Sequence, residues 1–117
     1  MTFDADMPRL PTSLWVDAHL RRLNEQGKSY YIVNKGAFAA GTVLIKISLL
    51  DGTARLLSQI RNMEGELGWM AALKQDVTPE QEVDGYIQRA LSRDPDLWVI
   101  EIEDRQGENP FEGKILL

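Results

Sequence analysis

Residues 42–61 read TVLIKISLLDGTARLLSQIR, and the fold expected from the sequence is decided by this stretch. The dipeptide Asp51-Gly52 lies between two runs of apolar and β-branched residues, which is typical of a two-residue type I′ hairpin turn. That turn pairs Ile47 with Leu56 and gives the hairpin one face that is almost wholly apolar. The sequence therefore predicts an antiparallel hairpin with a defined register.

A third strand is predicted to continue the apolar face of this hairpin. A four-residue loop over residues 62–65 places the small Ser58 opposite the large Trp69. Upstream, residues 28–34 are rich in aromatic and β-branched side chains and predict a further strand. Four consecutive strands are thus expected in the first two thirds of the chain.

Helices are predicted on both sides of these strands in the chain. Residues 13–26 place apolar side chains at helical spacing, with Thr12 or Ser13 as the N-cap. Residues 78–81, Thr-Pro-Glu-Gln, have the pattern of a capped helix start with proline in the first turn. Pro95 ends this second helix.

The stretch 94–107, DPDLWVIEIEDRQG, predicts the last strand, over residues 97–103. The elements then follow the order α-β-β-β-β-α-β. They predict one α+β domain over residues 1–117, with an antiparallel sheet of about five strands and two helices packed on one face. Residues 1–11 are expected to form an N-terminal arm, and residues 106–117 a C-terminal tail.

Three pieces of the chain carry a resemblance to a known family. They are DPDLWVIEIEDR at 94–105, LWV with LRR within 14–22, and GTVLIK at 41–46. With these pieces the chain resembles a family of small bacterial proteins catalogued as a domain of unknown function, the family numbered 1491, over residues 9–107. The resemblance implies a short, soluble, bacterial single-domain protein and brings no assigned activity.

The composition excludes several kinds of site. The chain of 117 residues has no cysteine, which excludes disulfides, thiolate zinc sites and cysteine nucleophiles. Its single histidine, His19, excludes the usual zinc site with two or three histidines. No apolar run is long enough to span a bilayer, and the acidic start lacks the order of a secretion signal. A cytoplasmic protein without a membrane partner is expected.

The charge is unevenly distributed along the chain. The net charge of −5 argues against a nucleic-acid partner bound through phosphate attraction. Residues 1–61 contain eight basic and five acidic side chains, whereas residues 62–117 contain five basic and thirteen acidic ones. The two halves are expected to neutralise each other within the fold. The alternative is that they steer self-association or the docking of a basic partner.

The carboxylates of the last strand are the first candidates for chemistry. Glu101 and Glu103 share one face of that strand, opposite the apolar face, at a spacing of about 7 Å. With Asp104 they form a candidate site for a hard divalent cation such as Mg²⁺. No other cofactor is predicted. The alternative is a solvated acidic face that pairs with basic neighbours.

Two further candidates lie in the first half of the chain. Lys35, Gly36 and Gly41, in a glycine-bounded loop, are candidates for a small anion site, with an ordinary hairpin loop as the alternative. His19 is a candidate for a general base; no motif surrounds it, and the alternative is a structural histidine.

The other face of the hairpin mixes basic and apolar side chains. We expect it to form an interaction surface for an acidic protein partner or for a second copy of the chain, with an ordinary solvent-facing sheet as the alternative. Its residues are Leu44, Lys46, Arg55, Leu57 and Arg61.

The function is unknown from the sequence, and two hypotheses are carried forward. The first is a small cytoplasmic protein-interaction or accessory module, not an enzyme, that self-associates or binds a protein partner. The second is a small metal-assisted hydrolase or transferase that uses the carboxylate pair Glu101 and Glu103, with His19 as its base.

Overall fold

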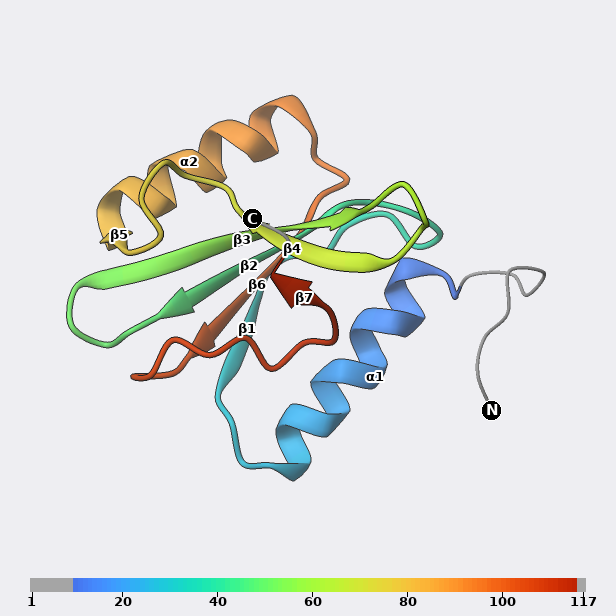
Figure 1. The fold of residues 1–117 in the computed structure, drawn as a ribbon, viewed down its shortest axis with the longest axis horizontal. Coiled ribbons are helices and arrows are strands. Elements are labelled where there is room, and N and C mark those ends of the chain that lie inside the picture. The colour runs from blue at the N-terminus through green and yellow to red at the C-terminus, as the bar shows by residue number, and fades with distance from the viewer. Residues whose placement is uncertain (1–9, 116–117) are drawn as a thin grey trace.

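One mostly antiparallel sheet forms the centre of the molecule, and a helix lies on each side of it (Figure 1). The computed structural model describes residues 10–115 of the chain. The elements in chain order are α1 (Thr12–Glu25), β1 (Tyr30–Asn34), β2 (Val43–Ser48), β3 (Thr53–Arg61), β4 (Leu67–Ala71), β5 (Thr78–Pro79), α2 (Glu80–Arg93), β6 (Trp98–Glu103) and β7 (Lys114–Ile115). The predicted α+β class is confirmed, and the short strands β5 and β7 are additions to the expected order.

The strand that comes late in the chain lies near the middle of the sheet. The strand order is β1-β6-β2-β3-β4-β7, and β5 pairs with β3 off this path. Strand β6 runs antiparallel to β1 and parallel to β2. Strands β1 and β2 are therefore not neighbours, and β1 forms one outer edge of the sheet.

The expectation that both helices pack on one face is wrong. Val16, Leu20 and Leu23 of α1 pack with the odd-numbered residues of β2, whereas α2 packs with Leu44 of that strand on the opposite face. Every residue of β2 is buried, because the strand has a helix on each side. A sheet covered on both faces needs apolar residues at both alternating positions.

The expected hairpin register is wrong by one residue. Ile47 pairs with Arg55 rather than with Leu56, because the loop has three residues instead of two. Within that loop Leu50 adopts a φ of 62°, and the Asp51 carboxylate accepts a hydrogen bond from Thr53 N at 2.9 Å. The hydrogen bonds from Thr53 also lower the pKa of Asp51.

The next turn differs from the expectation in the same way. Trp69 pairs with Gln59 rather than with Ser58. Asn62 N donates a hydrogen bond to Glu66 O, so the loop consists of residues 63–65 rather than the expected residues 62–65. Because both faces of the sheet are buried, the apolar pattern does not distinguish these registers.

Both helices begin without the predicted side-chain caps. Helix α1 follows Pro11, and the backbone N–H groups of Thr12 and Ser13 donate instead to carbonyl groups of the loop after β1. Helix α2 follows Pro79, while the Thr78 hydroxyl donates to Gln75 O and Thr78 itself belongs to β5. Tertiary contacts thus supply the partners that capping side chains usually provide.

The described part of the C-terminal tail packs on the sheet. Phe111 is buried in the core beneath α1, and Trp69 Nε1 donates to the Glu112 carbonyl at 2.9 Å. After this anchor, β7 pairs in parallel with β4 at the sheet edge opposite β1. Most of the predicted N-terminal arm, residues 1–9, lies outside the described residues.

Neither helix within residues 10–115 has the length and apolar character that crossing a membrane requires.

Candidate functional site

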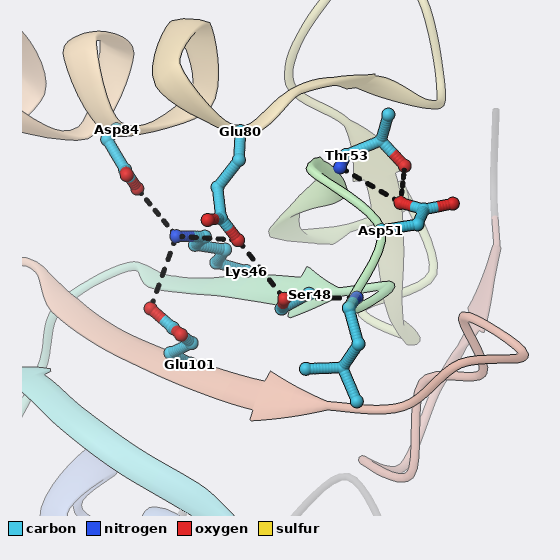
Figure 2. A network of polar contacts seen from close by, with 8 residues as sticks. Lys46, Ser48, Asp51, Thr53, Glu80, Asp84 and Glu101 are labelled. Carbon is cyan, nitrogen blue, oxygen red and sulfur yellow. Dashed lines mark hydrogen bonds and ion pairs between the residues drawn. The ribbon is translucent and has the colours of Figure 1, made fainter.

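A buried lysine surrounded by three carboxylates is the main polar cluster between α2 and the sheet (Figure 2). Lys46 Nζ, on β2, lies 2.7 Å from Asp84 Oδ1 and 3.5 Å from Glu80 Oε1, both on α2. It also lies 3.3 Å from Glu101 Oε1 on β6. Glu80 and Asp84 face the same way because they are four residues apart on a helix. We call these four residues the Lys46 cluster.

The environment of Lys46 favours its charged form. The Lys46 side chain is only 5% exposed, and burial alone would lower the pKa of its ammonium group. The hydrogen bond to Asp84 and the negative charges of Glu101 and Asp84 outweigh burial, so the net pKa lies above the ordinary value of 10.5. A lysine that stays protonated is neither a nucleophile nor a base at neutral pH. The Lys46 cluster therefore binds α2 to the sheet.

The raised pKa of Lys46 predicts a loss of stability at alkaline pH. The folded protein holds this proton more tightly than the unfolded chain does, so the contribution is complete below pH 10.5 and is lost as pH rises through the folded pKa. We expect urea midpoints to fall above about pH 10.5 more steeply for the wild type than for Lys46→Met. Parallel pH profiles for the two proteins would contradict this expectation.

Two of the three carboxylates predicted to hold a divalent cation, Glu101 and Asp104, are engaged with protein groups. Glu101 contacts the Lys46 ammonium, so the cation beside it belongs to the chain itself. Glu103 is half-buried and lies opposite Ser48. Asp104 accepts hydrogen bonds from the backbone N–H groups of Gln106 and Glu108, which stabilise a turn. Within residues 10–115, no group of three or more histidine or carboxylate side chains is placed to hold a metal ion.

His19 lies on the other side of the sheet from these carboxylates. It belongs to α1, is 5% exposed, and its Nδ1 donates to the Trp15 carbonyl at 2.8 Å. Its ring stacks on Phe111 with a centroid distance of 5.1 Å, and its Nε2 lies 3.9 Å from Glu112 Oε2. Because α1 and α2 cover opposite faces, the structure does not bring His19 together with Glu101.

The glycine-bounded loop has a structural role in this arrangement. A Cβ atom on Gly36 would lie 2.3 Å from Asp96 O, and one on Gly41 would lie 2.9 Å from the same oxygen. The loop is fixed to the start of β6 by Ala37 N, which donates to Asp96 O. Lys35 is exposed at the edge of this loop. The glycines thus allow two backbones to approach each other, which the glycine spacing alone did not reveal.

The predicted interaction surface is not one face of the sheet. With the observed register, Leu44 and Lys46 lie beneath α2, while Leu57 belongs to the core beneath α1. Arg55 shares the face of Leu57 and pairs with Asp76 at 2.8 Å, and Arg61 follows on that face by alternation. Leu44, Lys46 and Leu57 are buried, so these residues do not form a common docking surface.

The observed ion pairs neutralise some of the opposite charges of the two halves of the chain. Lys46 and Arg55 come from the basic half of the chain, and each pairs with carboxylates of the acidic half. This is the internal neutralisation that was expected from the sequence.

The open edge strand β1 is a surface that the sequence did not single out. Tyr31, Ile32 and Val33 are 55%, 48% and 43% exposed, although they are consecutive apolar residues in a strand. Strand β1 pairs with β6 on one side only. The run Tyr-Tyr-Ile-Val predicted a strand, but a continuous apolar run is more typical of a buried strand than of an edge. We call Tyr30–Asn34 with its free backbone side the β1 edge.

A shallow hollow lies at the start of this strand, where α1 leads into β1. It measures about 420 Å³ and is lined by residues of this connection, Asn24, Lys28, Ser29, Tyr30 and Tyr31. Neither Glu101 nor His19 lines it, so the residues first suspected of catalysis do not share this hollow.

Comparison with known families gives a match over nearly the whole chain. The family model described as "Protein of unknown function (DUF1491)" matches residues 10–112. No curated protein matches the chain.

Three solved structures are similar to this fold. A crystal structure of a DUF1491 family protein from Caulobacter crescentus CB15 is 38% identical, with a TM-score of 0.80 over 92% of this chain and 99% of that one. The NMR structure of a DUF1491 family protein from the same organism is also 38% identical, with a TM-score of 0.79 over 95% and 100% of the two chains. Protein Atu0922 from A. tumefaciens is 28% identical, with a TM-score of 0.66 over 83% and 87%.

Proposed function

The chain belongs to the DUF1491 family of proteins of unknown function, and we propose that it acts as a protein-interaction module that docks its partner on the β1 edge. The observation that carries the proposal is the exposure of Tyr31, Ile32 and Val33 in a strand with one free side. Natural proteins usually protect such edges with charges, proline or β-bulges; β1 contains neither charge nor proline, and its one irregularity is a register shift between Ile32 and Asn34. An exposed edge strand is a common means of binding another chain, through backbone hydrogen bonds.

The partner in this proposal is a protein located in the cytoplasm. A net charge of −5 is unfavourable for a nucleic acid, and the absence of cysteine is in keeping with a reducing compartment. An enzymatic role has less support. Lys46 is held in its charged form, and His19 and Glu101 lie on opposite faces of the sheet.

The proposal is tested by capturing partners from an extract of bacterial cells on immobilised protein. Ile32→Lys introduces a charge on the β1 edge, and Met63→Lys introduces the same charge on a fully exposed apolar residue of a distant loop. We expect wild type and Met63→Lys to retain the same protein, and Ile32→Lys to lose it. Retention that is equal for all three proteins would contradict the proposal, and so would the lack of any retained protein if the purified protein is also monomeric.

A further inference from the structure

We infer that the occupant of the β1 edge is a second copy of this chain, bound as a two-fold symmetric dimer in which the two β1 strands pair antiparallel about Ile32. This inference rests on the proposed function, because it names the partner of the same edge. The two sheets would then join into one continuous sheet across the interface. Four observations support this particular partner.

The first observation is the direction of the backbone groups. Glu103 N donates to Ser29 O, which places Ser29 in a hydrogen-bonded pair with β6. Such pairs alternate along the regular part of the ladder, which extends to Ile32, so the N–H and C=O groups of Tyr30 and Ile32 point away from β6. Ile32 therefore presents both a donor and an acceptor to the free side. With the two-fold axis at Ile32, the two copies of this residue exchange two backbone hydrogen bonds.

The second observation is the match of side chains in this register. Ile32 lies beside Ile32 of the second copy, and Tyr31 approaches Val33, which lies at a register shift between Ile32 and Asn34. Aromatic and β-branched cross-strand pairs are among those that stabilise sheets. In a two-fold contact the same strand is used by both copies, so each contact between Tyr31 and Val33 occurs twice.

The third observation concerns charge. Strand β1 is uncharged, but Lys28 precedes it and Lys35 follows it. Both lysines lie outside the strand, so no charged side chain stands at the two-fold axis at Ile32. The loop that contains Gly36 lies against the turn with the exposed Asp94 and Asp96, since Ala37 N donates to Asp96 O. We therefore expect Lys28 of one copy to lie near this acidic turn of the other.

The fourth observation is that the other outer edge of the sheet is partly covered. The tail strand β7 pairs with β4 at Gly68 and Trp69, and Phe111 and the Trp69–Glu112 hydrogen bond hold the tail there. Pairing of β1 with β4 of another copy is thereby hindered, and that is the pairing that would extend into a fibre. An isologous contact between two β1 strands closes on itself as a dimer.

The inference is tested first by the mass of the purified full-length protein in light scattering coupled to size exclusion. We expect the wild type and Met63→Lys to elute at the mass of two chains at high concentration. Ile32→Lys places two positive charges against each other at the two-fold axis and is expected to elute as a monomer. Circular dichroism and urea unfolding of each variant establish that it is folded. A folded wild type of monomer mass at every concentration would overturn the inference.

A cross-link tests the register directly, because the chain has no cysteine of its own. Cα atoms of a hydrogen-bonded antiparallel pair lie about 5.5 Å apart, within the range of about 4.4–6.8 Å that a disulfide spans. We expect Ile32→Cys to form a disulfide-linked dimer under mild oxidation much faster than the control Met63→Cys. Equal rates for the two variants would show that the two strands do not meet at Ile32.

The two experiments separate this inference from the proposed function. If the purified protein is monomeric but its capture of a protein from the extract depends on Ile32, the β1 edge binds a different protein and the dimer is wrong. If the purified protein is monomeric and nothing is captured, both are wrong.

Discussion

Replacement of Lys46 by methionine is expected to lower the free energy of unfolding by about 3 kcal/mol. Methionine keeps most of the length of the side chain but removes the charge that three carboxylates surround. Removing one partner from a buried ion pair leaves uncompensated charge and costs about 3–5 kcal/mol. The lower end of that range applies because Glu80 and Asp84 remain partly exposed and water can solvate them. Urea unfolding followed by circular dichroism measures the loss.

A double variant separates charge from packing in this experiment. Lys46→Met with Glu101→Gln removes one of the three repelling carboxylates, so we expect it to recover about 1 kcal/mol of the loss. Lys74→Met is the matched control, because Lys74 is exposed and a surface substitution changes stability by at most about 0.5 kcal/mol. If Lys46→Met unfolded at the wild-type urea concentration, the Lys46 cluster would not hold α2 on the sheet.

The second large effect is expected for Gly36→Ala. The added Cβ would lie 2.3 Å from Asp96 O and 2.8 Å from Leu97 C, which are backbone atoms that cannot move aside without shifting β6. Overpacking of this kind costs about 1–3 kcal/mol and sometimes more, and we expect a loss of about 3 kcal/mol. The thermal midpoint and the urea midpoint should both fall.

Gly85→Ala is the matched control for the same change of side chain. Gly85 lies in the interior of α2, where the added Cβ would approach only the flexible end of the Arg89 side chain, at 3.3 Å. Alanine is favoured over glycine in a helix by about 1 kcal/mol, so this variant should be as stable as the wild type or more stable. If both variants were equally stable, the close approach of the glycine loop to β6 would not limit the fold.

Local elements were predictable from the sequence because local signals define them. The helices, the hairpin at Asp51-Gly52 and the strand ending at Glu103 lie within a few residues of their expected positions. The registers were not predictable, because the argument for them assumed that only one face of β2 is buried. Leu44 and Ile45 are both buried, on opposite faces, so a shift of one residue leaves apolar groups inside in either case.

The Lys46 cluster shows a second limit of sequence reasoning. The sequence predicts Glu101 in a candidate cation site and Lys46 in a separate interaction surface. Their pairing depends on the insertion of β6 beside β2, where the two residues lie opposite each other. No local pattern distinguishes this partner from the other carboxylates of the acidic half. The same holds for the β1 edge, since a run such as Tyr31 to Val33 predicts a strand without its position in the sheet.

The central position of β6 has a consequence for the order in which the chain can fold. Strands β1 and β2 have no direct contact in the sheet and are joined only through β6, which is made some fifty residues later (Val43 pairs with Trp98). A chain emerging from the ribosome can form the local β2–β3–β4 meander early, but β1 must wait for β6. Such a topology has high contact order and is expected to fold slowly. A chain truncated before Trp98 should therefore remain vulnerable to proteolysis, even though α1, α2 and the five strands β1 to β5 are present.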